Sequence, residues 1–282
     1  MYIRGTFLKQ LSSLLKISVS LVSVFLFTAT SRGIPYVFSA GAGEAGMGNA
    51  CVMKQGFWSS FNNQALLAGN SSPSLGFNYE NRFGIRELGT STAAIILPAG
   101  KTSLGALYSR FGCTDYRRNM AGLACGLKLS ENIAAGIQID YFSCKTTGEY
   151  DDMQCFTFEA GLSVTPGKNT TIGVHLFNPL PKGLSKSFLP GSLRIGAGTE
   201  LNSYLFAGAE AEISTGRKLT FRTGVEYKVI RNLQLRAGFS TNTTSFSFGT
   251  GYQAGIVTID LGFSTHPQLG VTSSASLVFR IR

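Results

Sequence analysis

Charged residues are scarce in this chain, and histidine and tryptophan are almost absent. Of the 282 residues, two are histidine and one is tryptophan, and charged residues make up 14%. The sequence contains no G-x-S-x-G, no H-E-x-x-H and no histidine-rich cluster, the patterns that carry a serine nucleophile or a metal ion. We therefore predict that the protein is not an enzyme and that it holds no metal and no cofactor.

The cysteines also lack the spacing of a metal site, because no C-x-x-C pair occurs. In an oxidising compartment their odd number leaves at least one thiol free. Cys113 and Cys144 fall in predicted loops that could be neighbours, so a disulfide between them is one alternative, and small reduced side chains throughout are the other. The five cysteines are Cys51, Cys113, Cys125, Cys144 and Cys155.

Glycines at positions 41, 43 and 46 have the G-x-G-x-x-G spacing of a dinucleotide-binding turn but lack its context. No hydrophobic strand runs into them. No acidic residue that could bind a ribose occurs from Cys51 to Tyr79. We therefore reject a nucleotide-binding enzyme, and these glycines need another explanation.

The apolar run from Ile17 to Ala29 is shorter than the about 20 residues of a membrane-spanning helix. Basic residues precede it and small residues follow it, which is typical of a secretory signal peptide. We predict a signal peptide over residues 1–40, cleaved between residues 30 and 42. The exported remainder keeps an excess of Lys and Arg, which suits phosphate-bearing lipid headgroups, and we expect no nucleic-acid partner.

From Pro73 onward, apolar residues alternate with small or polar ones. In KLTFRTGVEYK, residues 218–228, one face is apolar and the other is polar or glycine, and a period of two indicates a strand. About fourteen such segments follow one another, near residues 73–82, 90–98, 102–112, 119–129, 132–143, 153–165, 170–178, 191–200, 203–213, 218–228, 231–240, 244–253, 255–265 and 272–282.

The connections between these segments alternate in length. Short turns, such as residues 98–101 and 129–132, alternate with longer loops, such as residues 144–152 and 178–191. Short periplasmic turns, longer external loops and an even strand number are typical of outer-membrane barrels. We predict an all-β fold, a closed antiparallel transmembrane β-barrel of about 14 strands over residues 73–282, in the outer membrane of a Gram-negative bacterium. A secreted β-sandwich is the alternative.

The segment between the signal peptide and the first strand does not alternate. It is rich in glycine and aromatic residues, and glycine permits close backbone approach. We predict that residues 41–72 form an N-terminal plug inside the lumen. The residues expected to build it are Gly46, Met47, Gly48, Trp58, Phe61, Asn62 and Asn63.

Two short stretches of this segment, GMGNA at residues 46–50 and FNNQALLA at residues 61–68, resemble the N-terminal signature of the PorV/PorQ-type and FadL-like outer-membrane proteins of Bacteroidota. The chain departs from that signature at Gln64 and Leu66, where proline and glycine are usual. The resemblance implies a fourteen-stranded barrel with two alternative functions. The FadL-like members imply passive uptake of a hydrophobic small molecule, and the PorV/PorQ members imply docking of exported proteins in type IX secretion.

The strand register also predicts which charged side chains face the lumen. We interpret them as a polar ladder that fixes the register, and a track for a substrate headgroup is the alternative. The residues are Glu210, Glu212, Arg222, Glu226, Arg236, Asp260 and Arg280.

Two sets of loop residues are candidates for external contacts. Basic residues could meet lipopolysaccharide phosphates, although a solvated loop face is the alternative; they are Arg117, Arg118, Lys182, Lys186, Arg217 and Lys218. The longest loop is unusually apolar, and we predict that it contacts a ligand or a partner, with a cover over the barrel mouth as the alternative. Its key residues are Phe177, Leu180, Leu184, Phe188 and Leu189.

Overall fold

A computed structural model describes residues 40–147, 152–179, 189–241 and 244–281. The predicted signal peptide lies outside the described residues. Among the described residues, no helix is both long enough and apolar enough to cross a membrane.

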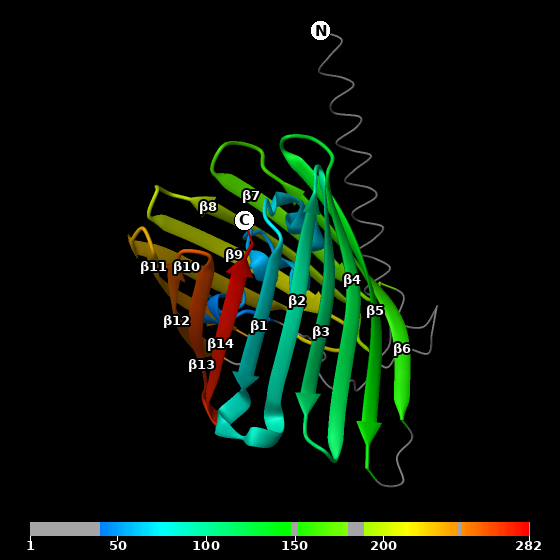
Figure 1. The fold of residues 1–282 in the computed structure, drawn as a ribbon. Coiled ribbons are helices and arrows are strands. Elements are labelled where there is room, and N and C mark those ends of the chain that lie inside the picture. Colours follow the sequence, from blue (N-terminus) through cyan, green and yellow to red (C-terminus); the bar gives the residue numbers. More distant parts are fainter. Residues whose placement is uncertain (1–39, 148–151, 180–188, 242–243, 282) are drawn as a thin grey trace.

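Fourteen antiparallel strands form one closed barrel, which confirms the predicted fold class (Figure 1). Each strand pairs with its neighbours in sequence, and the first strand pairs with the last. The strands are β1 (Ser74–Asn81), β2 (Gly89–Ala99), β3 (Thr102–Gly112), β4 (Tyr116–Lys128), β5 (Ile133–Thr146), β6 (Met153–Val164), β7 (Thr170–Phe177), β8 (Ser192–Glu200), β9 (Leu205–Ser214), β10 (Thr220–Ile230), β11 (Leu233–Ser240), β12 (Ser245–Ala254), β13 (Val257–His266) and β14 (Gly270–Arg280).

Closure depends on the register between β1 and β14, in which Phe77 lies opposite Leu277. A closed barrel leaves no strand edge with unpaired backbone groups, which hydrocarbon would not tolerate. The connection between β1 and β2 contains two short 3-10 helices, η3 (Arg82–Gly84) and η4 (Arg86–Leu88). It belongs to the end of the barrel with the longer connections, which we assign to the cell exterior.

The outer surface of the barrel is apolar. Leu123 and Ile137, for example, leave 66% and 67% of their surface exposed, which is unfavourable in water and favourable in lipid. Exposed tyrosines lie toward both ends of this apolar wall, as expected for aromatic girdles at the two membrane interfaces. They are Tyr79 and Tyr108 toward the longer connections, and Tyr227 and Tyr252 toward the short turns. The protein is therefore an outer-membrane β-barrel.

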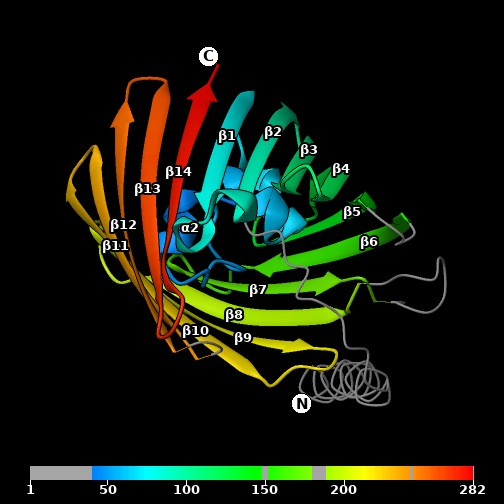
Figure 2. The same cartoon turned by 90° about the horizontal axis from the view of Figure 1, so that it is seen from below.

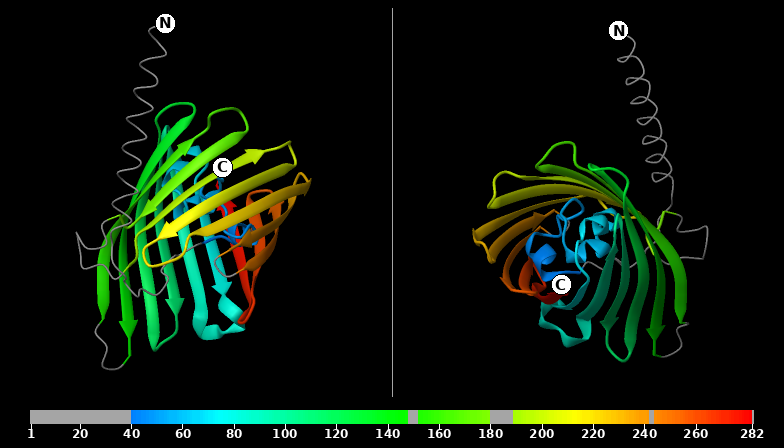
Figure 3. Two further views of the ribbon diagram at one scale, coloured as in Figure 1. Left: turned by 180° about the vertical axis from the view of Figure 1, so that it is seen from behind. Right: turned by 45° about the horizontal axis from the view of Figure 1, so that its top comes forward.

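Residues 40–72, called the inner segment below, lie inside the barrel (Figures 2 and 3). They form one short α-helix and two 3-10 helices: α2 (Ala42–Gly46), η1 (Phe57–Phe61) and η2 (Gln64–Gly69). The side chain of Asn63 caps η2 by accepting a hydrogen bond from the amide of Ala65 at 3.1 Å. α2 packs against β12 and β13, whereas η2 packs against β4, β5 and β6. That this segment closes the lumen as a plug stays a prediction.

Glycines on the inward face of the barrel receive the backbone of the inner segment. A Cβ added at Gly238 would collide with the backbone of Met47 and Gly48, and one added at Gly262 would collide with the carbonyl oxygen of Ala42. These glycines pair across neighbouring strands in four groups, which together we call the glycine belt. It consists of Gly126, Gly136, Gly161, Gly173, Gly196, Gly224, Gly238, Gly249 and Gly262.

All five cysteines are free thiols in the structure. Cys144 is buried on the inward face of β5, whereas Cys113 lies in the connection after β3. Of the two alternatives from the sequence, the disulfide between Cys113 and Cys144 is therefore absent from the structure.

Candidate functional site

A series of ion pairs lines the side of the lumen formed by β8 to β13. Arg194 on β8 is central to this side. Its guanidinium donates to both carboxylate oxygens of Glu210, at 2.7 and 3.0 Å, to the side-chain oxygen of Asn62 at 3.2 Å and to the carbonyl of Asn49 at 3.1 Å. Glu210 also accepts from the amide of Val52 at 3.0 Å. This ion pair lies within the barrel wall, and its hydrogen bonds hold the inner segment against the wall.

The other predicted ladder residues extend this arrangement. Six of the seven form ion pairs in two groups, which together we call the ion-pair network. Its groups are Arg194, Glu210, Arg222 and Glu212, and Lys54, Glu226, Arg236 and Asp260. The seventh, Arg280, is exposed near the short turns and donates to the hydroxyl of Thr258 at 3.2 Å.

Two members of the ion-pair network, Arg194 and Lys54, were not predicted from the sequence. Arg194 lies opposite Glu212 in the register of β8 and β9, so alternation in residues 191–200 could have found it. Lys54 lies in the inner segment, where no periodicity indicates which side chains meet the wall. Its ammonium group is 2.6 Å from a carboxylate oxygen of Glu226. Among the described residues, no group of three His, Cys, Asp or Glu side chains is placed to hold a metal ion.

Apolar side chains gather on the opposite side of the lumen, formed by β14 and β2 to β7, where Asp140, Glu159 and His175 are also buried. The apolar side chains pack against aromatic residues of the inner segment in one continuous cluster, called the apolar lumen cluster below. Its members are Phe57, Trp58, Phe61, Leu67, Ala94, Ile96, Leu107, Met120, Ala124, Phe142, Cys155, Phe177, Leu189, Val278 and Ala40.

Aromatic contacts occur at both ends of this cluster. The ring of Phe142 meets the ring of Phe177 edge to face, with centroids 6.1 Å apart. In the inner segment, Trp58 contacts Phe57 at 4.9 Å and Phe61 at 6.1 Å between centroids. The cluster therefore extends from the external end of β7 to the inner segment, and the aromatic side chains of that segment occupy the apolar side of the lumen.

The apolar loop that the sequence singled out is only partly described. Phe177 and Leu189, which border it, are both buried and both belong to the apolar lumen cluster. Leu180, Leu184 and Phe188 lie outside the described residues. Among the predicted plug residues, Trp58, Phe61, Asn62 and Asn63 are buried inside the barrel, and so are Gly46, Met47 and Gly48.

Gln64, one of the two departures from the family signature, binds the barrel wall. Its amide nitrogen donates to a carboxylate oxygen of Glu159 at 2.5 Å and to the carbonyl of Ser60 at 3.1 Å. The same carboxylate oxygen lies 2.8 Å from Nε2 of His175. A proline at position 64 could make neither side-chain contact, so this chain has its own attachment between η2 and β6.

Replacing Gln64 with alanine should lower the free energy of unfolding by about 1–3 kcal/mol, because Glu159 would lose a donor in a buried site. Chemical unfolding in detergent micelles, followed by tryptophan fluorescence, measures the change. Gln253→Ala near the short turns is the matched control and should change stability by less than about 0.5 kcal/mol. Equal effects of both substitutions would contradict the assigned role of Gln64.

Glu44 in α2 makes the attachment of the inner segment depend on pH. Burial, and after it the nearby Asp260 carboxylate, raise the pKa of its carboxyl from 4.5 to about 7 against the opposing effect of Arg236. Because the folded state holds the proton more tightly, this stabilisation is complete below pH 4.5 and is lost as the pH rises through 7. Its maximum is about 3 kcal/mol.

We expect a protease to release the inner segment more readily at pH 8 than at pH 5. Glu44→Gln, which mimics the protonated acid, should remove the difference between the two pH values. The measurement is cleavage rate by a protease whose own rate is corrected with a denatured substrate at each pH. If the variant kept the full pH dependence, another group would be responsible.

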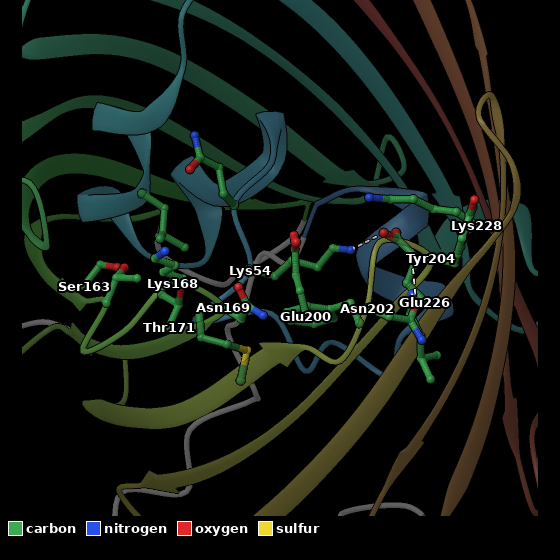
Figure 4. A pocket seen from close by; sticks show the side chains of 16 residues that line it. Lys54, Ser163, Lys168, Asn169, Thr171, Glu200, Asn202, Tyr204, Glu226 and Lys228 are labelled. Carbon is green, nitrogen blue, oxygen red and sulfur yellow. Dashed lines mark hydrogen bonds and ion pairs between the residues drawn. The ribbon is translucent and has the colours of Figure 1, made fainter.

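A polar cavity of about 380 Å³ lies where the inner segment meets the short turns (Figure 4). Lys54 and Glu226 form an ion pair at its wall, and the ring of Phe206 lies 4.7 Å from the ammonium group. Charged and amide side chains from the turns and the adjoining strand ends complete much of the lining: Lys168, Asn169, Glu200, Asn202 and Lys228. This end of the lumen suits water and polar groups better than an apolar molecule.

No family model matches the chain, and no curated protein sequence matches it. Solved structures do. A FadL homologue of Pseudomonas aeruginosa is similar at 15% identity with a TM-score of 0.61, over 90% of this chain and 100% of that one. The toluene transporter TodX of Pseudomonas putida is similar at 12% identity with a TM-score of 0.66, over 88% and 98% of the two chains.

A third similar structure is the outer-membrane protein Omp33 of Acinetobacter baumannii, with 12% identity and a TM-score of 0.51 over 74% of this chain and 98% of that one. Identities this low show a shared fold alone. The likeness to PorV/PorQ proteins and the link to Bacteroidota stay predictions from the sequence. The fold of this chain is thus the barrel fold of the FadL homologue and TodX.

Proposed function

We propose that the protein is an outer-membrane channel for the passive uptake of a hydrophobic small molecule. The observation that carries this proposal is the apolar lumen cluster. A barrel that admits polar solutes needs a polar lining. Here, apolar side chains extend along one side of the lumen, from Phe177 and Leu189 at the external end to Trp58 in the inner segment.

The path begins at the residues that border the β7–β8 loop. A hydrophobic molecule would contact Phe177 and Leu189 there and continue along Phe142 and Met120. The aromatic side chains of η1 occupy the next part of the apolar side, so the inner segment acts as a plug. It must shift before a molecule can pass.

The similar structures support a transport role for this fold. The FadL homologue and the toluene transporter TodX cover nearly the whole barrel at low identity. A docking role for exported proteins, with its link to type IX secretion, rests only on the short signature at residues 46–68. We therefore favour uptake over docking.

Uptake into proteoliposomes tests the proposal. The purified protein is reconstituted, and the entry of radiolabelled toluene, a long-chain fatty acid and glucose is measured separately. We expect faster entry of at least one of the hydrophobic probes than into empty liposomes, and no faster entry of glucose. Rapid entry of glucose would instead indicate an open porin, and no acceleration of any probe would contradict the proposal.

Phe142→Ser and Phe248→Ser make a matched pair for this assay. Phe142 is buried in the apolar lumen cluster, whereas Phe248 faces outward and leaves 57% of its surface exposed. A hydroxyl in the path should slow hydrophobic entry about tenfold, since a polar group without a partner opposes an apolar ligand. The outward substitution should leave the rate unchanged. Equal rates in the two variants would place the path elsewhere.

A further inference from the structure

The outward face of β1, β2 and β3 carries a groove of about 430 Å³ near the external end of the barrel. It lies on the lipid-facing surface and belongs to neither the apolar lumen cluster nor the ion-pair network. The side chains that shape it are Phe77, Tyr79, Ser91, Ala93, Tyr108 and Arg110.

The strand register explains the shape of this groove. Ala93 on β2 lies between Phe77 on β1 and Tyr108 on β3. One step nearer the exterior, Ser91 lies between Tyr79 and Arg110. Small residues on the middle strand therefore make a floor, and large residues on the two flanking strands make the walls. The groove runs along β2, parallel to the direction of the strand.

Two arginines lie at the external end of the groove. Arg86 belongs to η4 above β2, and Arg110 forms part of the β3 wall. Both are exposed, and in the described part of the chain neither guanidinium has an ion pair or a hydrogen bond. Arg118, one of the cations expected to meet lipopolysaccharide, is instead buried with its guanidinium 4.4 Å from the centroid of the Phe111 ring.

We propose that this groove binds one lipopolysaccharide molecule of the outer leaflet. An acyl chain lies over Ala93 between the rings of Phe77 and Tyr108, and a phosphate of the headgroup is bound by Arg86 and Arg110. Tyrosines at the level of the headgroups are typical of membrane barrels. The planar guanidinium has the geometry for paired hydrogen bonds to phosphate oxygens.

The position of the groove on the barrel indicates which ligand it binds. It faces lipid, so an acyl chain is the ligand that the surroundings supply. It lies at the end with the longer connections, which faces the exterior, where the outer leaflet carries phosphorylated lipopolysaccharide. The arginines give charge complementarity to those phosphates at the end of the groove where the headgroups lie.

Native mass spectrometry in mild detergent tests the proposal, with diphosphoryl lipid A and phosphatidylglycerol as separate probes. The wild type should retain one lipid A molecule. The double variant Arg86→Gln/Arg110→Gln should bind lipid A about tenfold more weakly or worse, because charge-assisted contacts are lost. Ala93→Leu should weaken binding similarly by filling the floor. Both changes lie on the outer surface, and heat-modified gel mobility checks that the barrels are folded.

Matched substitutions on the opposite wall provide the controls. Arg231→Gln removes an exposed cation from the short turn between β10 and β11, and Ala237→Leu fills an outward position between Val225 and Phe248. Both should bind lipid A like the wild type. Equal binding by all variants would show general lipid association and overturn the site. Binding of phosphatidylglycerol as tight as that of lipid A would overturn the assignment to lipopolysaccharide.

Discussion

Replacing Arg194 with glutamine is expected to lower the free energy of unfolding by about 3–5 kcal/mol, because it removes two charge-assisted hydrogen bonds to the buried Glu210 carboxylate and leaves Arg222, at 2.9 Å, as its paired cation. Arg194 and Glu210 are both almost completely buried. The amides of Cys51 and Val52 still donate to this carboxylate, at 3.1 and 3.0 Å, but neither carries a full positive charge. The substitution also removes the donor to Asn62, so the inner segment loses its attachment to β8.

Reversible folding into lipid vesicles in a urea gradient gives the free energy difference. Arg280→Gln removes the same charge from an exposed site with one hydrogen bond, so its effect should stay within about 0.5 kcal/mol. The double variant Arg194→Gln/Glu210→Gln should be more stable than Arg194→Gln alone, because it removes a buried carboxylate that has lost two of its donors, while Arg222 keeps its ion pair with Glu212. A single variant as stable as the wild type would show that Arg222 alone compensates the Glu210 carboxylate.

The sequence was sufficient to predict the barrel because each strand carries its own evidence. Residues 218–228 alternate so regularly that their inward face, with Arg222 and Glu226, follows from the period alone. The ion pairs between neighbouring strands follow from the same register, which places Arg222 opposite Glu210 and Glu226 opposite Arg236. Local periodicity fixes these positions, so no knowledge of distant contacts is needed.

The inner segment could not be placed in the same way. Gln64 contacts Glu159 on β6, and the amide of Cys51 contacts Glu210 on β9, far along the chain in both cases. Short 3-10 helices such as η1 have too few residues to show a period. The lipid-facing groove was also hidden, because its floor and walls depend on which residues of three strands lie side by side.

One of the glycines with the spacing of a nucleotide-binding turn has a steric explanation, and so has the wall glycine that it contacts. Gly46 in the inner segment lies against Gly249 in the wall, and a Cβ added at Gly46 would be 2.7 Å from the Cα of Gly249. Two backbones approach closely only where neither residue carries a side chain. The glycine belt therefore determines how deeply the inner segment sits against the wall.

Replacing Gly136 with valine should displace the inner segment and open the lumen. A Cβ at this position would be 2.5 Å from the amide nitrogen of Ala65 and 2.6 Å from the carbonyl oxygen of Gln64, distances that no packed structure tolerates. The strand itself should persist, since valine suits β-structure. Overpacking costs about 1–3 kcal/mol, which would shift the balance between docked and undocked segments by about 5–150-fold.

Planar-bilayer conductance and limited proteolysis of residues 40–72 measure this shift. The variant should show frequent conductance steps and rapid cleavage of the inner segment, and the wild type should show few steps and slow cleavage. Gly105→Ala is the matched control, because its Cβ would meet the nearest atom, the Cβ of Ala124, at an ordinary 3.5 Å. Gly136→Ala should lie between the two. If Gly136→Val conducted no more than Gly105→Ala while remaining folded, the inner segment would not be the element that closes the lumen.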